Sequence, residues 1–255
     1  MTDITVGELR EIAATIAADV GREAGERRSN GFSWTTKSSR TDVVTEIDTW
    51  AEEQVVARIE AVRPGDGFLG EEGTNRPSST GITWVIDPID GTTNLLYDLP
   101  GYSVSIAAAI DGNSHAGAVY DPIRQELYSA ALGEGATRNG EPIAPTTATD
   151  LSTSLVGTGF SYQSEDRGPQ ARALEVILPA VRDIRRNGGA ALDFCAVASG
   201  RLDAYFERGL SPWDSAAGSL IASEAGASVW DDGLSVAVAP GIASSFMALL
   251  ERASA

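Results

Sequence analysis

The sequence contains very few of the residues that soft metals and many nucleophilic enzymes use. Its 255 residues include one cysteine, Cys195, and one histidine, His115. A single cysteine excludes an intramolecular disulfide and a cysteine-rich zinc site, and its apolar neighbours predict a packing role. His115 begins an apolar stretch after a turn-like Asp-Gly-Asn sequence, so it too is predicted to be structural. Chemistry that depends on histidine therefore has almost no residue to act through.

Long apolar runs are also missing. No segment approaches the roughly 20 consecutive apolar residues that a membrane span needs, and the N-terminus lacks the basic-then-apolar pattern of a signal peptide. The hydrophobic fraction of 42% is still enough for a sizeable core. We therefore expect a cytoplasmic globular protein without a membrane partner.

Positive charge is scarce. Lysine and arginine number 19 against 36 acidic residues, the formal net charge is −17, and Lys37 is the only lysine. Such a charge repels nucleic-acid backbones and anionic membranes at long range, so neither is an expected partner. An anionic substrate would need local compensation of this charge.

Two amphipathic helices are predicted near the N-terminus. A capping box at Thr5 to Glu8 starts a helix of about residues 5–27, and Thr45 starts a second one that ends near Val62. Asp48 then falls in the first turn of the second helix, where an acidic residue also has a purely structural role as a cap. The Ser-, Thr- and Gly-rich segment between the helices, residues 29–41, is predicted to be a polar loop or flap that carries Lys37.

The remaining pattern predicts one α/β domain with two lobes. Lobe 1, about residues 1–148, is expected to combine helices with a largely antiparallel sheet, and lobe 2, about residues 149–255, to alternate strands with helices. The predicted strands lie near 68–71, 82–86, 103–110, 115–120 and 126–131, with a turn at Asn139-Gly140. The predicted helices of lobe 2 lie near 171–181, 189–199 and 214–224.

A group of acidic residues surrounds the end of the predicted strand 82–86. The sequence Asp87-Pro88-Ile89-Asp90-Gly91-Thr92-Thr93-Asn94 places two carboxylates just past this strand and then several hydroxyl, amide and backbone N–H donors. Glu71-Glu72 precedes it, and Asp214 opens a later helix. Two aspartates alone could form an ordinary acidic turn, but the combination favours a site for a metal and an oxyanion.

Electrostatics supports a metal if these carboxylates converge. Two carboxylates about 4 Å apart repel by roughly 4 kcal/mol at an effective dielectric constant near 20, so several such pairs need a cation. Oxygen ligands without histidine or cysteine nearby favour magnesium, or manganese, over zinc.

Three motifs carry a resemblance to the inositol monophosphatase family. They are Gly70-Glu71-Glu72, Asp87-Pro88-Ile89-Asp90-Gly91-Thr92-Thr93-Asn94 and Trp213-Asp214-Ser215-Ala216-Ala217-Gly218. The segment from Lys37-Ser38-Ser39 to Asp48 resembles the N-terminal segment of that family, and order and spacing fit over nearly the whole chain. The resemblance implies a layered α-β-α-β-α sandwich of the inositol monophosphatase and fructose-1,6-bisphosphatase type, a homodimer and lithium-sensitive hydrolysis that depends on two or three magnesium ions.

The resemblance also implies a role for each residue of the group. Glu71, Asp87 and the carbonyl of Ile89 would hold one magnesium, and Asp87, Asp90 and Asp214 a second. Thr92, paired with Asp48, would orient and help to deprotonate a water that the metal activates, and this water would attack phosphorus without a covalent phosphoenzyme. Lys37 occupies the position of the family's flap lysine, and the N–H groups of Gly91 and Thr92 would hold phosphate oxygens.

The substrate is less sharply defined by the motifs. By resemblance, Glu207 and Asp214 together with Gly188, Gly189 and Ala190 would line the pocket for the alcohol portion of a small phosphate ester. Glu207 as an ordinary surface acid and the glycines as a tight turn are the structural alternatives, and Arg208 and Ser211-Pro212 depart from the residues expected in an inositol phosphatase. The substrates considered are myo-inositol 1-phosphate first, then histidinol phosphate, and then fructose 1,6-bisphosphate and adenosine 3′,5′-bisphosphate.

Two other functional classes remain at this point. Haloacid-dehalogenase phosphatases place two aspartates two residues apart to form a phospho-aspartate, whereas Asp87 and Asp90 are three apart. Some members of the inositol monophosphatase family act as partner-binding proteins in transcription, and no sequence feature identifies such a surface here.

Overall fold

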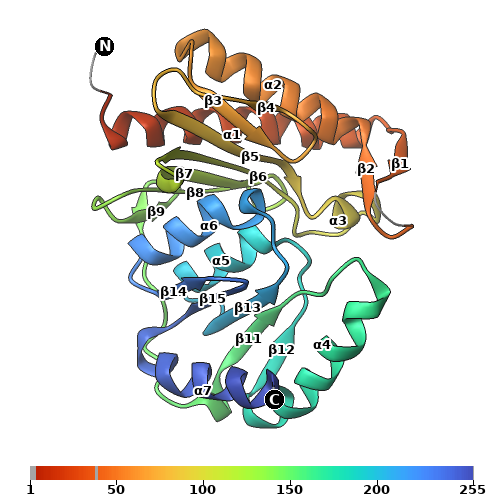
Figure 1. Ribbon diagram of the computed structural model, residues 1–255, viewed down its shortest axis with the longest axis vertical. Coiled ribbons are helices and arrows are strands. Elements are labelled where there is room, and N and C mark those ends of the chain that lie inside the picture. Colours follow the sequence, from red (N-terminus) through yellow and green to blue (C-terminus); the bar gives the residue numbers. More distant parts are fainter. Residues whose placement is uncertain (1–3, 38–39, 255) are drawn as a thin grey trace.

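The computed structural model describes residues 4–37 and 40–254, and these residues form five layers of helices and sheets (Figure 1). Helices α1 (Val6–Ser29) and α2 (Glu46–Val62) cover the outer face of an eight-stranded sheet. Helices α5 (Ala190–Ala198) and α6 (Pro212–Glu224) lie between that sheet and a five-stranded sheet. Helices α4 (Ser164–Ile177) and α7 (Ala243–Ser254) form the last layer. The predicted α-β-α-β-α order is therefore confirmed.

The eight-stranded sheet is antiparallel except at one strand pair. Its strand order is β10-β9-β8-β7-β6-β5-β3-β4, and only β3 and β5 run parallel. Its strands are β3 (Gly67–Gly70), β4 (Asn75–Arg76), β5 (Ile82–Asp90), β6 (Ser103–Ile110), β7 (Asn113–Asp121), β8 (Glu126–Ala131), β9 (Ala136–Arg138) and β10 (Glu141–Pro142). The predicted turn at Asn139-Gly140 joins β9 to β10, and both of its residues have positive φ, as a tight hairpin turn requires.

The five-stranded sheet mixes parallel and antiparallel pairs. Its order is β12-β11-β13-β15-β14, in which β11 runs parallel to both of its neighbours. Its strands are β11 (Leu155–Thr158), β12 (Asp183–Arg185), β13 (Ala204–Arg208), β14 (Ser228–Asp231) and β15 (Leu234–Val238). Short 3-10 turns occupy Leu151–Thr153, Leu178–Ala180 and Pro240–Ile242. The predicted division of the chain near residue 148 falls between the two sheets.

Both N-terminal helices begin where the sequence predicts. Thr5 and Thr45 are the N-caps, and each forms a complete capping box, with Glu8 and Asp48 respectively. Three apolar cores fill the spaces between the layers, and Cys195 is buried in the core around α5 and α6. No helix in the described part of the chain is both long and apolar enough to cross a membrane.

Two predictions about strands were wrong. Residues 29–41 do not form only a loop, because β1 (Trp34–Thr36) pairs with β2 (Val43–Thr45) in an antiparallel hairpin. Strand β5 does not end at Ile86 but continues to Asp90, with a shift in register against β6 between Asp87 and Asp90. In both cases the pairing partner supplies the hydrogen bonds that extend the strand.

The predicted start of α4 was also wrong. This helix begins at Ser164 rather than near residue 171. Its first turn contains Glu165 and Asp166, and acidic residues there favour a helix start. Pro169 lies inside the helix, where its missing N–H removes one backbone hydrogen bond.

Candidate functional site

The end of β5 brings Asp87 and Asp90 to the boundary between the two sheets. Oδ1 of Asp87 accepts a hydrogen bond from the backbone N–H of Ile89 at 3.1 Å. The two carboxylate oxygens of Asp90 accept from the backbone N–H groups of Ala190 and Ala191, at 3.1 and 2.9 Å. These two residues start α5, so Asp90 ties the end of the large sheet to a helix N-terminus, where negative charge is stabilised.

Burial and mutual repulsion destabilise the charges of these carboxylates. Burial raises the pKa of Asp87 well above its ordinary value, and the negative charges of Glu71, Asp90 and Asp214 raise it further. Burial also raises the pKa of Asp90, to which Asp214 adds. For Asp214, burial raises the pKa to about 7, although its bond from the N–H of Ser211, at 2.6 Å, opposes the rise. The charges of the site therefore act together on the pKa values of Asp87, Asp90 and Asp214.

Lys37 supplies a positive charge next to this group. Its Nζ lies 2.8 Å from Oε1 of Glu71 and 2.6 Å from Oε1 of Glu72. Burial alone would lower the pKa of Lys37, but the charges of both glutamates outweigh burial and raise it. Burial raises the pKa of Glu72 to about 7 despite this contact. Lys37 therefore neutralises only part of the negative charge.

Thr92 and Asp48 form a buried pair beside the carboxylates. The hydroxyl of Thr92 donates to Oδ1 of Asp48 at 2.7 Å and lies 3.0 Å from the carbonyl oxygen of Ile89. The other oxygen of Asp48 accepts from the backbone N–H and the hydroxyl of Thr45. Asp48 is thus a helix cap and the hydrogen-bond partner of Thr92 at once, and its catalytic role stays a prediction.

Gly91 allows the chain to turn sharply between β5 and a short helix. This glycine has φ +87°, and a Cβ there would lie 2.6 Å from the carbonyl oxygen of Gly101. The helix that follows, α3 (Thr92–Leu96), was not predicted from the sequence. The first N–H groups of a helix have no partner within it, so the N–H groups at Gly91 and Thr92 are suited to an anion.

A cavity of about 350 Å³ opens over this site. Seven of the predicted residues line it, which are Lys37, Glu71, Asp90, Gly188, Ala190, Glu207 and Asp214. Oε2 of Glu207 accepts from the hydroxyl of Tyr205 at 2.6 Å. A Cβ at Gly159 would approach the same oxygen to 1.9 Å, so Gly159 makes room for this carboxylate.

The other predicted residues do not line this cavity. Asp87, Ile89 and Thr92 are buried, and a Cβ at Gly189 would lie 3.0 Å from Oδ2 of Asp90. Ser38 and Ser39, which belong to the N-terminal motif, are outside the described residues.

The donor set fits a hard divalent cation. Within the described part of the chain, no three acidic, histidine or cysteine side chains stand in a complete metal-ligand arrangement, and other groups already bond several of the carboxylates. Buried carboxylates that repel one another, with a single lysine among them, are nevertheless stabilised by a divalent ion, and their oxygen atoms suit magnesium.

Sequence reasoning missed several residues of the site. Glu52 is buried and accepts from the backbone N–H groups of Glu72 and Thr74 at 2.8 and 2.9 Å, so it fixes the turn that presents Glu71. Its place one turn after Asp48 on the same face of a helix was the available signal. Arg186 also lines the cavity, and a Cβ at Gly188 would lie 2.6 Å from its guanidinium. No spacing in the sequence pointed to Arg186.

Comparisons with known proteins agree with this geometry. The model of the inositol monophosphatase family matches residues 6–245. The chain is 45% identical over 272 aligned positions to a Mycobacterium tuberculosis protein named inositol-1-monophosphatase SuhB, covering 96% of this chain and 93% of the relative. It is 41% identical to a Pasteurella multocida protein named Nus factor SuhB, covering 85% of this chain and 84% of that relative.

The fold is also that of solved relatives. The structure of Mycobacterium tuberculosis SuhB matches with a TM-score of 0.87 and 44% identity, covering 98% of each chain. The residues that the family model matches include every member of the carboxylate group. The chain therefore belongs to the inositol monophosphatase family.

Proposed function

We propose that this protein is a metal-dependent phosphatase that hydrolyses myo-inositol 1-phosphate to inositol and inorganic phosphate. The observation that carries the proposal is the group of buried Asp87 and Asp90 with half-buried Asp214 and Glu71, in which burial and neighbouring negative charges raise the pKa of the aspartates beside the Thr92–Asp48 pair. The 45% identity to a protein named inositol-1-monophosphatase supports the choice of substrate.

The residues that would hold the metal are those of the carboxylate group. Glu71, Asp87 and the carbonyl of Ile89 would hold one magnesium ion, and Asp87, Asp90 and Asp214 a second, with manganese as an alternative to either. When bound, divalent ions would neutralise the carboxylates and the phosphate and lower the pKa of water, which is the chemistry that phosphate-ester hydrolysis needs.

Thr92 and Asp48 provide the route for the proton of the attacking water. When the hydroxyl of Thr92 donates its only hydrogen to Asp48, its oxygen keeps lone pairs that can accept a hydrogen bond. Thr92 can therefore accept a proton from water while passing its own to Asp48, whose pKa is raised by burial. Lys37 would hold Glu71 in place beside this water.

The phosphate and the alcohol would occupy different parts of the cavity. The N–H groups of Gly91 and Thr92 would donate to phosphate oxygens at the start of α3. Glu207 and the backbone of Gly188, Gly189 and Ala190 would contact the hydroxyl groups of inositol. A half-buried carboxylate such as Glu207 is a strong acceptor for hydroxyl donors, and the hydrogen bond from Tyr205 fixes its orientation.

Release of inorganic phosphate from a panel of esters tests the proposal. The panel consists of myo-inositol 1-phosphate, histidinol phosphate, fructose 1,6-bisphosphate and adenosine 3′,5′-bisphosphate, each with magnesium and with a chelator. We expect the highest kcat/KM for inositol 1-phosphate and no activity with the chelator. If kcat/KM were higher for histidinol phosphate, that ester would replace inositol 1-phosphate as the proposed substrate, and the proposed metal-dependent hydrolysis would stand.

A partner-binding role is the second candidate, since relatives at 38–42% identity are named Nus factor SuhB. If the purified protein hydrolysed none of the four esters with magnesium and a pull-down recovered one stoichiometric partner, this role would replace the enzymatic one. The homodimer and the cytoplasmic location remain predictions.

A further inference from the structure

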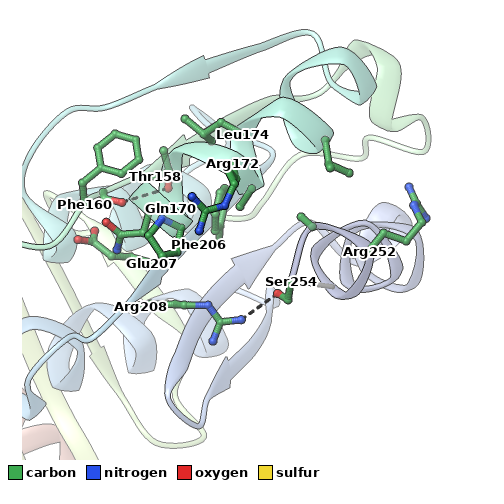
Figure 2. A pocket seen from close by; sticks show the side chains of 15 residues that line it. Thr158, Phe160, Gln170, Arg172, Leu174, Phe206, Glu207, Arg208, Arg252 and Ser254 are labelled. Carbon is green, nitrogen blue, oxygen red and sulfur yellow. Dashed lines mark hydrogen bonds between the residues drawn. The ribbon is translucent and has the colours of Figure 1, made fainter. Parts of the chain in front are cut away.

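A second cavity of about 550 Å³ shares Glu207 with the cavity over the carboxylate group, and Figure 2 shows the side chains that line it. Four segments of lobe 2 enclose it, which are the end of β11, one face of α4, the end of β13 and the last turn of α7. Its volume is within the range of small-molecule sites in proteins. None of the chemistry described above uses this cavity.

Its charge is opposite to that of the rest of the molecule. Arg172, Arg208 and Arg252 line the cavity, and Glu207 is the only carboxylate among the lining residues. Within the described residues, none of the three arginines has a carboxylate within 4 Å, although the chain carries a net charge of −17. Arg208 donates to the hydroxyl of Ser254 at 3.0 Å, and Arg252 to the carbonyl of Ala248 at 3.3 Å. An anion would satisfy guanidinium groups that this acidic protein leaves without a counter-charge.

Its floor is apolar. Phe206 lies at its base, Leu174 faces it from α4, and Phe160 closes one side (Figure 2). The carboxylate-lined cavity, by contrast, contains five acidic side chains, Asp42, Glu71, Asp90, Glu207 and Asp214. Apolar surface with a few charged groups at the edge binds an organic anion with an aromatic or branched aliphatic body better than it binds free phosphate.

The two cavities share a thin wall. Glu207, Arg208, Gly159 and Phe160 line both of them. Since Glu207 lines the second cavity, a molecule bound there would contact the residue that the proposed function assigns to substrate hydroxyls.

We propose that this second cavity binds a small organic anion with an apolar body, whose charged group lies between Arg172 and Arg208, while Arg252 adds positive charge at the other end of the cavity. The site is separate from the carboxylate group, and it does not depend on the reaction proposed above.

Fluorescence titration with 8-anilinonaphthalene-1-sulfonate, an apolar anion, tests the site in the full-length protein. Arg172→Gln and Arg252→Gln change exposed side chains that line only this cavity, so we expect native thermal stability. Loss of a charged hydrogen bond should weaken probe binding by about ten-fold for Arg172→Gln, and loss of a more distant charge should weaken it less for Arg252→Gln. Arg185→Gln removes the same charge from exposed β12, outside the cavity, and should bind the probe like the wild type.

Two results would overturn the proposal. One is equal affinity of the wild type, Arg172→Gln and Arg252→Gln for the probe. The other is a loss of probe affinity in Arg185→Gln as large as the loss in Arg172→Gln, which would indicate a general effect of net charge. A crystal soaked with the probe should show its sulfonate between Arg172 and Arg208, and density only at other places would also reject the site. These binding measurements do not depend on catalysis. If the protein released no phosphate from any ester, they would still decide whether the second cavity binds the anion.

Discussion

The hydroxyl of Thr92 lies 2.7 Å from Oδ1 of Asp48, and both side chains are buried although they are 44 residues apart in the chain. The other oxygen of Asp48 caps α2. The start of one helix thus orients a hydroxyl at the start of another. This relationship makes the proton route a property of the fold rather than of a flexible loop.

Asp48→Asn and Thr92→Val should each lower kcat. Removing a group that receives the proton costs roughly 10²- to 10⁴-fold in rate, and KM should change little because neither side chain lines the cavity. Steady-state phosphate release measures both constants.

Thr45→Ala is the control for the helix cap, because it removes the hydroxyl that accepts from Ile47 and donates to Asp48 but leaves the Thr92–Asp48 contact. It should lower the free energy of unfolding by about 0.5–2 kcal/mol while kcat stays close to the wild-type value. A fall in kcat for Thr45→Ala as large as for Asp48→Asn would show that Asp48 acts only through the helix.

Magnesium should stabilise the protein more at pH 8 than at pH 6. Asp214 and Glu72 have pKa values raised by burial to about 7, so protons compete with the ion at pH 6. A raised carboxylate pKa also means that the folded state binds more protons than the unfolded state, so the metal-free protein loses stability as pH rises from about 4 to 7. Thermal unfolding with magnesium and with a chelator, at several pH values, measures both the stabilisation by magnesium and the pH dependence of the metal-free protein. A larger magnesium effect at pH 6 would contradict this assignment.

Much of the fold followed from local chemistry in the sequence. The capping boxes at Thr5 and Thr45 and the turn at Asn139-Gly140 depend on neighbouring residues, and the structure confirms them. The hairpin of β1 and β2 and the extension of β5 to Asp90 depend on strand partners, which local patterns do not reveal.

The site also combines residues that local sequence motifs predict with residues that only the fold brings together. The family motifs gave its carboxylates, whereas Glu52 and Arg186 belong to no motif and became visible only when the fold brought them to the site. Residues whose partners are set by tertiary packing are therefore the ones that sequence reasoning missed.

Glu52→Gln should weaken metal binding although Glu52 is not itself a proposed ligand. An amide cannot accept from both the N–H of Glu72 and that of Thr74, so one buried donor loses its partner at a cost of about 1–3 kcal/mol. The turn that presents Glu71 should loosen, and the affinity for magnesium should fall about 10- to 100-fold. Isothermal titration with magnesium gives the affinity.

Glu53→Gln is the control for this variant, since Glu53 is the exposed neighbour on the same helix. It should bind magnesium like the wild type. Equal affinities for Glu52→Gln and the wild type would remove Glu52 from the site.

Gly159→Ala should impair recognition of inositol rather than hydrolysis itself. Its Cβ would lie 1.9 Å from Oε2 of Glu207, so this carboxylate must move. KM for inositol 1-phosphate should rise about ten-fold, which is roughly 1.4 kcal/mol, whereas hydrolysis of 4-nitrophenyl phosphate, which has no hydroxyls, should change much less. Glu207→Gln should show the same split between the two substrates, and an equal loss on both would argue against a role of Glu207 in selectivity.

The most direct test of the central claim is phosphate release from myo-inositol 1-phosphate by the wild type and by Asp90→Asn, both with magnesium. This substitution keeps the size of the side chain but removes its charge, and circular dichroism should verify that the variant is folded. We expect kcat/KM to fall by about 10³-fold, which is roughly 4 kcal/mol of transition-state stabilisation. Full activity of Asp90→Asn would contradict the proposed carboxylate site.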